Sequence, residues 1–378
     1  MKTILQKYRV SLTTDTWRSI QNLNYMCVTA HFIDDNWKLH KRIINFFLVP
    51  NHKGDTIGRE LETCIREWGI TKVVSVTVDN ASSNDTALTY LQRRLQDIPG
   101  CVLLDGKSLH IRCCAHIVNL IVTEGLKEID DSIEMIRNAV KFVRSSTTRA
   151  KKFDECVVEE KIDSKAGLCL DVPTRWNSTY LMLETALKYQ KAFDMMVVDG
   201  NYENYFRENE DGKQRKRPPT NIDWEKAKEY VTFLKTFYEV TLKFSGTHTY
   251  YTTANLFFRE IYEVRQLLTT LKSAQTSILR NMAFNMKAKF DKYWGDAEKI
   301  NDMLIIAAVL DPRYKMGLVK VCIEMATGES MGADMVCFRI KEKLQELLNF
   351  YNENHTSTKE KQVSQSQPIP QSNSCTSA

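Results

Sequence analysis

The sequence predicts an α/β protein in which a mixed β-sheet is followed by a long all-helical stretch. Residues 9–49 are typical of three strands joined by short connections. Residues 56–80 add an amphipathic helix and then a β-branched strand, and from about residue 175 the pattern is helical. The predicted order is therefore β-β-β-α-β-α-β-α. The strand–helix–strand crossover should place its two strands parallel and with right-handed connection.

The first three strands are predicted at residues 9–17, 25–33 ("YMCVTAHFI") and 39–49 ("LHKRIINFFLV"). "DDNWK" turns the chain between the second and third. Connections this short make the three strands antiparallel neighbours.

Helices and strands alternate in the next part. Ile57, Leu61 and Ile65 recur at helical spacing, and Gly69 is a typical helix end. The predicted elements of this part are a helix over 56–69, a strand over 72–80 ("KVVSVTVDN"), a helix over about 83–96, a short strand near 109–113 and helices from about 115 to 160. Residues 9–113 should therefore supply a five-stranded mixed sheet.

The later part of the chain should contain essentially no strand between about residues 185 and 345. Charged residues ending in Pro-Pro predict a loop or linker over 199–220. The predicted helices lie at about 223–244, 252–273, 277–293, 299–309 and 334–352. Phe233 pairs with Phe237, and Leu304 with Ala308, at i,i+4, so these side chains should face inward. The final residues, 353–378, lack apolar side chains for a core and are expected to be disordered.

Composition narrows the class without deciding the function. The 378 residues are 43% hydrophobic and carry a net charge of +5, which permits nucleic-acid binding but does not imply it. The N-terminus lacks the apolar core of a signal peptide, and no run of 18 apolar residues predicts a membrane span. Ten cysteines without a CxxC pair indicate reduced, intracellular thiols.

Two aspartates lie near the carboxyl ends of predicted strands. Asp15 shares a strand face with Thr13 and Trp17, and Asp79 ends the strand 72–80. On adjacent strands the two carboxylates would converge and repel unless a cation bridges them, and Mg²⁺ is the usual cation at such a site. The alternative is that they are turn or N-cap aspartates, because "VDNASSND" is also a good helix start.

Five blocks in order carry a resemblance to a known family. They are "SLTTDTW", "VTVDNASSND", "LHIRCCAHIVNLIV", "DVPTRWNSTYLML" and "AAVLDPRYKM". Together, from about residue 8 to about 352, they resemble the hAT superfamily of DNA transposases, in the plant type that includes domesticated sleeper-like zinc finger BED proteins.

The resemblance implies a ribonuclease H-like mixed sheet interrupted by a large all-helical insertion. It divides the chain into the first part of that core over 1–184, the insertion with the hAT-like ribonuclease H-fold region over 185–352, and the tail over 353–378. By motif, Asp15 and Asp79 match two of the family's three acidic metal ligands, which would hold Mg²⁺, weakly in this chain.

In the family, the third acidic metal ligand is a glutamate in a C-terminal "SExxFS"-like block, which also belongs to a dimerisation region. No such block is found, and Glu342, Glu346 and Glu353 lack the motif, so no role is transferred to them. The BED finger that precedes the core in the family is not found either. The sequence therefore resembles the central part of a transposase, catalytically incomplete.

The segment "RCCAHIVNL" places Cys113 and His116 as C-x-x-H, near His110. Zinc needs a second ligand pair at motif spacing, which the sequence lacks, so no zinc is expected. The resemblance implies instead that Cys113 and His116 lie beside the active site, with His116 near the DNA backbone. The alternative is a histidine that caps a strand–helix junction.

Trp176 begins a predicted helix in "PTRWNST". The resemblance implies a platform for a base flipped out of the duplex, with Arg175 beside it to hold a phosphate. The alternative is a buried core tryptophan.

Residues 137–152 hold six basic residues and no acid until Asp154. Arg137, Lys141 and Arg144 fall on one helical face and form a candidate phosphate-contact stripe, or a solvated face. "KQRKR" at 213–217 predicts either an accessible nuclear localisation signal or a soluble loop.

Two functions follow as hypotheses. The first is a nuclear, DNA-associated transposase-like protein, a remnant or domesticated derivative, whose partners are DNA, itself or full-length transposase-like proteins. The second is a non-catalytic protein-interaction or regulatory module on the same fold.

Overall fold

The computed structural model describes residues 1–127, 131–172, 175–210, 213–246, 253–274, 276–327 and 330–364. The chain forms two compact units. One consists of Met1–Ile111 together with Asn301–Ala378, and the other of Arg112–Ile300. The predicted boundary at residue 184 does not coincide with a boundary between these units, because it falls inside helix α7 (Trp176–Lys188), which packs with helices of the second unit.

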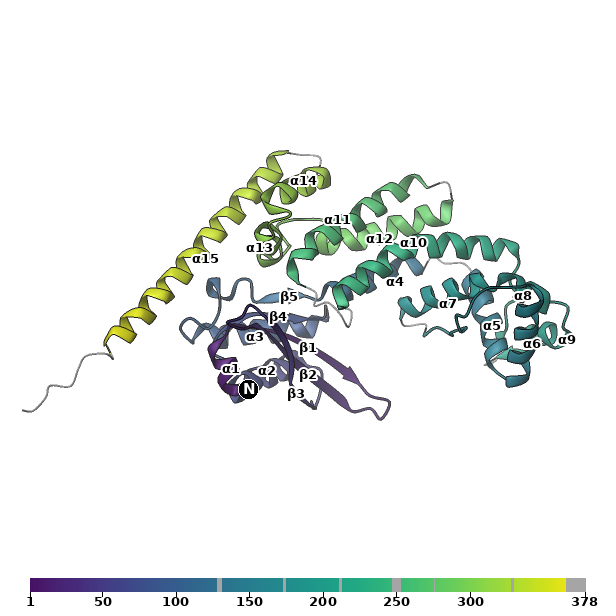
Figure 1. The fold of residues 1–378 in the computed structure, drawn as a ribbon, viewed down its shortest axis with the longest axis horizontal. Coiled ribbons are helices and arrows are strands. Elements are labelled where there is room, and N and C mark those ends of the chain that lie inside the picture. The colour runs from purple at the N-terminus through teal and green to yellow at the C-terminus, as the bar shows by residue number, and fades with distance from the viewer. Residues whose placement is uncertain are drawn as a thin grey trace, which may run out of the picture. The chain divides into compact units, whose positions relative to one another are not determined.

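The first unit contains a five-stranded sheet with the order β3-β2-β1-β4-β5 (Figure 1). Its strands are β1 (Val10–Arg18), β2 (Asn24–Ile33), β3 (Leu39–Leu48), β4 (Val73–Val78) and β5 (His110–Arg112). β1 pairs antiparallel with β2 and parallel with β4. The predicted five-stranded mixed sheet and the parallel crossover are confirmed.

One face of the sheet forms the core of the first unit. Val10 and Leu12 of β1 and Met26 and Val28 of β2 are fully buried there, as their alternation predicts. Helices α2 (Gly54–Trp68) and α3 (Ser82–Gln96) contribute their apolar residues to the same core. The short helix α1 (Lys2–Lys7) adds Leu5.

Helices α2 and α3 approach each other closely at a glycine. A Cβ atom at Gly54 would lie 2.5 Å from the carbonyl oxygen of Ser83, so only glycine allows this contact. Gly69 ends α2 in the left-handed conformation, with φ 65°, as predicted.

The C-terminal helices of the first unit are α13 (Asp302–Leu310), α14 (Lys315–Thr327) and α15 (Ser330–Ser364). The block "LDPRYK" forms the turn between α13 and α14, where the guanidinium of Arg313 donates to both oxygens of the buried Asp311, at 3.0 and 2.7 Å. Leu304 and Ala308 are buried, as predicted.

The predicted disorder from residue 353 is wrong for its first part. α15 continues to Ser364, because residues 353–364 contain neither glycine nor proline and include good helix formers. Residues 365–378 lie outside the described residues.

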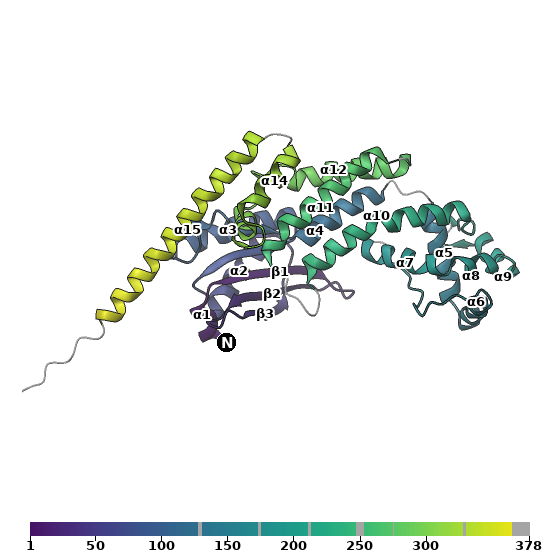
Figure 2. The same ribbon diagram turned by 45° about the horizontal axis from the view of Figure 1, so that its top comes forward.

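The second unit is predominantly helical (Figure 2). Its helices are α4 (Cys114–Leu126), α5 (Ser132–Arg144), α6 (Thr147–Glu159), α7 (Trp176–Lys188), α8 (Gln190–Met196), α9 (Gly200–Arg207), α10 (Asn221–Ser245), α11 (Phe257–Thr270) and α12 (Ser277–Trp294). Short 3₁₀ turns occupy Ala254–Leu256 and Leu271–Ser273, and a third, Leu104–Gly106, lies in the first unit. Phe233 and Phe237 of α10 are buried, as predicted.

The predicted loop over 199–220 is wrong in its first half. Helix α9 forms there because Tyr202, Tyr205 and Phe206 share a buried face, and Phe142 of α5 packs edge-on against Tyr202 at 4.9 Å. A hairpin of two-residue strands, β6 (Asn209–Glu210) and β7 (Lys213–Gln214), follows. The span expected to be free of strand therefore contains this small sheet.

In the part of the chain that the structure describes, no helix is both long enough and apolar enough to cross a membrane.

Candidate functional site

Asp15 lies on β1, and Asp79 directly follows the adjacent strand β4. The parallel register of β1 and β4 pairs Thr13 with Thr77, and each aspartate lies two residues further along its strand direction. Paired residues of parallel strands point to the same side, and neighbouring strands are about 4.8 Å apart. The predicted adjacency of the two strands is confirmed.

A second contact supports the shared face. The hydroxyl of Ser75 on β4 donates to the hydroxyl of Ser11 on β1 at 3.2 Å, one pair earlier in the same register. This row of polar side chains continues toward Asp15, within β1, and Asp79, which directly follows β4.

Asp79 also organises the start of α3. Its Oδ1 accepts hydrogen bonds from the backbone N–H of Ala81 at 2.9 Å and from Nδ2 of Asn84 at 2.6 Å. The alternative of a turn aspartate is therefore correct for Asp79, and it does not exclude metal binding, because both bonds use one carboxylate oxygen. The two bonds fix the carboxylate, while Asp15 lies exposed on its strand.

The chemistry of these donors fits a hard cation. Two carboxylates level with each other repel, and Mg²⁺ or Mn²⁺ prefers carboxylate oxygen ligands. Among the residues that the structure describes, no group of three or more His, Cys, Asp or Glu side chains could hold a metal ion. Asp15 and Asp79 are thus a pair of candidate ligands.

His116 lies in the first turn of α4, which Cys113 precedes as the N-cap residue, and both side chains are half-buried. The position matches the predicted strand–helix junction. His116 belongs to the second compact unit, whereas His110 belongs to the first, where its Nδ1 lies 3.7 Å from Asp85.

Trp176 is a core residue, with only 3% of its surface exposed. It begins α7, whose inward face includes Thr179, Tyr180 and Leu183 and packs against α10. The interpretation as a stacking platform is therefore not met in this conformation, since a base cannot reach a ring that the core already covers. Arg175, the N-cap residue of α7, is exposed.

The guanidinium of Arg137 has a partner inside the protein. Its Nε and Nη2 donate to the two carboxylate oxygens of Asp171, each at 2.8 Å, and Thr179 donates to the same carboxylate at 2.8 Å. Burial raises the pKa of Asp171, but the hydrogen bonds from Arg137 and Thr179 outweigh it and hold the pKa below its ordinary value. This ion pair, not a phosphate contact, accounts for Arg137.

The rest of the predicted basic stripe is mixed. Lys141 is half-buried, and Arg144 is exposed and donates to the carbonyl oxygen of Leu168 at 2.7 Å. An arginine that the stripe omitted, Arg149, lies over the ring of Phe142 at 4.3 Å. Only Arg144 among the three predicted side chains keeps substantial exposure.

The "KQRKR" segment is held against the second unit rather than free in a linker. Arg215 lies 3.9 Å over the ring of Tyr205, Lys216 pairs with Asp131 at 3.0 Å, and Arg217 pairs with the buried Asp223 at 2.6 Å. The side chains of Lys216 and Arg217 nevertheless remain 41% and 50% exposed, so both interpretations of the segment, a nuclear localisation signal or a soluble loop, stay predictions.

Family comparisons cover the chain in three consecutive stretches. The ZBED1 RNase-like domain matches residues 13–107, the ZBED1 RNase-like helical domain matches 111–233, and the hAT-like transposase RNase-H fold matches 255–351. The chain belongs to the hAT transposase family.

Several curated hAT-related proteins of plants are similar over most of this chain. The putative AC transposase of Zea mays is 36% identical over 324 residues, which are 85% of this chain and 38% of the relative. RICESLEEPER 2 of Oryza sativa subsp. japonica, a zinc finger BED domain-containing protein, is 34% identical over 82% of this chain and 41% of its own length. DAYSLEEPER of Arabidopsis thaliana is 29% identical over 86% and 44%. The chain thus spans less than half the length of these relatives.

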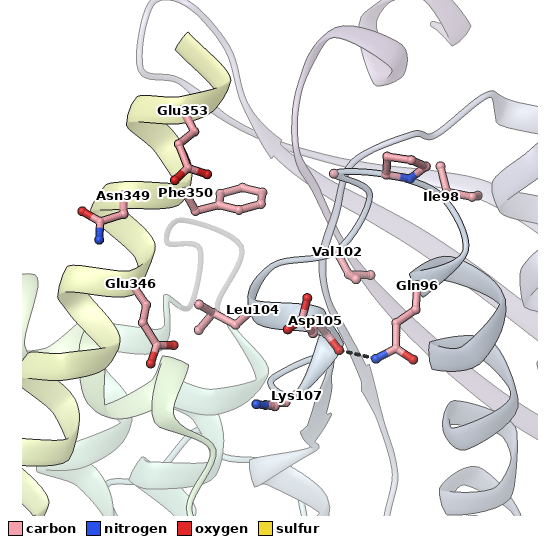
Figure 3. A pocket seen from close by; sticks show the side chains of 12 residues that line it. Gln96, Ile98, Val102, Leu104, Asp105, Lys107, Glu346, Asn349, Phe350 and Glu353 are labelled. Atoms are coloured by element: carbon pink, nitrogen blue, oxygen red, sulfur yellow. Dashed lines mark hydrogen bonds between the residues drawn. The ribbon is translucent and has the colours of Figure 1, made fainter. Parts of the chain in front are cut away.

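The glutamates near the end of this hAT chain lie far from the aspartate pair. Glu346 and Glu353 of α15 line a cavity of about 650 Å³ whose other wall includes Val102, Leu104 and Asp105 (Figure 3). Cys101, beside this wall, accepts from the N–H of Val73 at 2.7 Å, at the amino end of β4.

Asp79 follows the carboxyl end of β4, so the cavity and the aspartate pair lie at opposite ends of that strand. Six residues of strand separate Val73 from Asp79, which corresponds to about 20 Å. Glu346 and Glu353 therefore cannot complete a metal site with Asp15 and Asp79, and Glu342 lies exposed on the same helix.

Proposed function

We propose that this chain is a DNA-binding core of the hAT type in which Asp15 and Asp79 hold one divalent metal ion. The observation that supports the proposal is the parallel β1–β4 register, in which Thr13 pairs with Thr77, two residues before Asp15 and Asp79 respectively. The printed names of the relatives include transposases, which supports DNA as the partner. Mg²⁺ bound there would supply charge neutralisation for a phosphodiester.

By itself the described chain is proposed to be unable to cut DNA efficiently. Two-metal cleavage needs both the attacking and the leaving oxygen stabilised, and the two aspartates bind only one ion between them. Arg175 and Arg144 are the exposed basic residues proposed to contact phosphates, with Lys141 and His116 as further candidates.

Two measurements test the proposal. Binding to duplex DNA across a salt series should give a straight line in log affinity against log salt, with a slope set by the phosphates contacted. A binding signal without salt dependence would contradict the DNA proposal.

For the metal, supercoiled plasmid is incubated with Mn²⁺ and either the wild-type protein or an Asp79→Ala variant. Efficient nicking that the variant loses would show that two aspartates suffice for cleavage.

A second candidate, a protein-interaction module, is favoured by apolar side chains exposed on α14 and α15. Met331, Met335 and Phe338 follow each other at i, i+4 and i+7 on α15 and are 76%, 65% and 64% exposed. Such a stripe is typical of a surface that a partner covers. Pull-down from nuclear extract with wild type and a Met335→Lys/Phe338→Lys variant would test this function, and equal recovery with both would contradict it.

Nuclear localisation and self-association belong to the same proposal. The relatives' type of function requires access to DNA. A fluorescent fusion of the chain should accumulate in the nucleus, and cytoplasmic retention would contradict that part.

A further inference from the structure

An aromatic cluster lies on the same sheet face as Asp15. Trp17 of β1 pairs directly with Tyr25 of β2, and Phe46 of β3 pairs with Cys27, the neighbour of Tyr25 on that face. The three rings are in mutual contact, with centroids 5.7 Å apart for Trp17 and Tyr25, 5.4 Å for Tyr25 and Phe46, and 5.6 Å for Trp17 and Phe46.

This cluster is on the outer face of the three-stranded part of the sheet. Residues directly opposite each other in adjacent strands point to one side, so Trp17, Tyr25 and Phe46 face away from the core side that holds Leu12, Met26 and Val28. Trp17 is 37% exposed and Phe46 58% exposed, and Tyr25 between them is half-buried. Two large rings thus expose area to solvent on a rigid scaffold.

The cluster is continuous with the aspartate pair. Trp17 follows Asp15 by two residues on the same strand and the same face, a rise of about 7 Å. On the face that this register defines across β1–β3, Asp15 is the one acidic position, and the remaining positions are aromatic, aliphatic, hydroxyl, thiol or basic. An anionic strand held at Asp15 through a metal ion would therefore meet aromatic rings, and no further carboxylate, on its way along β1.

We propose that Trp17, Tyr25 and Phe46 form a stacking platform for unpaired bases of single-stranded DNA beside the Asp15–Asp79 site. This inference rests on the proposed DNA-binding function and adds the state of the DNA that the site prefers. A rigid sheet that displays aromatic rings is a recurring way to bind unpaired bases, because every base offers a π-face for stacking. Bases within a duplex are already stacked on each other and cannot use the platform.

A protein partner is the competing occupant of an exposed aromatic face. Two observations favour DNA over it: Trp17 lies two residues from Asp15 on the same face of β1, and the three rings contact one another in one cluster. An aliphatic replacement would serve a protein interface as well as a ring does, but it would not stack on a base. This difference makes the occupant testable.

The test compares Trp17→Leu and Trp17→Phe in the full chain by fluorescence anisotropy, with labelled oligothymidylate and a labelled duplex of equal length. Trp17→Leu keeps an apolar side chain without a ring, and Trp17→Phe keeps a ring. Trp37→Leu is the matched control, since Trp37 is 87% exposed in the β2–β3 turn, away from the cluster. Circular dichroism and urea unfolding verify that each variant is folded.

We expect Trp17→Leu to weaken oligothymidylate binding roughly 5- to 150-fold, the range for the loss of one base–aromatic stack. Trp17→Phe should retain most of the affinity, Trp37→Leu should match wild type, and duplex binding should change less than about 2-fold in all three. Phe46→Leu, at the other side of the cluster, should repeat the loss if Trp17→Leu proves unstable.

Several results would overturn the inference. If wild type, Trp17→Leu and Phe46→Leu bind oligothymidylate with equal affinity, the stacking platform is contradicted. Duplex binding, and with it the proposed function, is unaffected by that result. Equal weakening by Trp17→Leu and Trp17→Phe shows that the ring is not what binds. A dimer in sedimentation that Trp17→Leu converts to monomer, with unchanged oligothymidylate affinity, assigns the face to a second copy. Failure of wild type to bind either DNA overturns both proposals.

Discussion

The ion pair between Arg137 and Asp171 gives the sharpest test of how this helical unit is built. The perturbation is Arg137→Ala, which removes both charge-assisted hydrogen bonds to a carboxylate whose side chain is 0% exposed. Asp171 would keep the hydrogen bond from Thr179. The structure therefore predicts a stability effect, whereas a phosphate contact predicts an effect on DNA affinity.

The magnitude follows from the burial of the partner left behind. Removing one member of a buried pair typically costs 3–5 kcal/mol, because a charge remains uncompensated. The side chain of Arg137 is itself 27% exposed, so water entering the vacated space would solvate part of the carboxylate. We therefore expect a loss of about 3 kcal/mol in the free energy of unfolding, at the lower end of that range.

The assay is urea unfolding of the full chain followed by circular dichroism, with Arg144→Ala as the matched control. Arg144 lies on the same helix, is exposed and donates one hydrogen bond to Leu168, so its loss should cost about 1 kcal/mol or less. Because the pKa of folded Asp171 lies below its ordinary value, the ion pair's contribution is present above about pH 4 and is lost as the pH falls through the folded pKa. The gap between wild type and Arg137→Ala should therefore narrow in acid.

One result would refute this reasoning. If Arg137→Ala unfolds like wild type but reduces the slope of log DNA affinity against log salt by about 0.9, the guanidinium binds a phosphate and not Asp171. The same slope measured with Arg144→Ala then shows whether the whole predicted stripe contacts DNA.

Three further outcomes follow from other contacts. Asp223→Asn should lower the free energy of unfolding by about 3 kcal/mol at pH 7 and by less in acid. Burial raises the pKa of Asp223, but hydrogen bonds from Arg217 and from the start of α10 hold that pKa far below its usual range. Unfolding measured as a function of pH checks this prediction. Asp79→Ala should lower the free energy of unfolding by about 1 kcal/mol, because the hydrogen bonds at the start of α3 are lost, and Asp79→Asn should lower it less. Both variants should abolish Mn²⁺ binding in calorimetry. Unchanged Mn²⁺ affinity would contradict the proposed metal site. Gly54→Val should destabilise by about 1–3 kcal/mol, since its Cβ meets the backbone of α3, while Gly200→Ala, with open space around its Cβ, should stay near wild type in thermal melts.

The order of elements in the sheet and the adjacency of the strands that precede or carry Asp15 and Asp79 could be predicted because both depend on local rules. Alternation with period two marks β1, β2 and β4. The crossover helix α2 makes β4 parallel to β3, and β3 runs parallel to β1 because each is antiparallel to β2. Once two strands are adjacent, equal positions near their carboxyl ends bring two side chains together. The aromatic contact between Trp17 and Tyr25 depends on the same register, but its exposure could not be read from the pattern.

The charged and aromatic residues of the helical unit illustrate the opposite case. A basic run indicates charge, yet the sequence does not say that Asp171, 34 positions away, binds Arg137, or that Asp131 binds Lys216. Whether Trp176 stacks on a base or fills a core depends on which helices surround α7.

The sequence by itself determined the family and the order of strands and helices in the sheet region, because spacing along the chain is set by the geometry of neighbouring residues. Only the tertiary structure decided which basic and aromatic side chains remain exposed. The free energy of a charged or aromatic side chain depends on partners that folding brings from distant positions. Arg137 pairs with Asp171 and Trp176 is buried in the core, whereas Arg175 and Trp17 stay exposed.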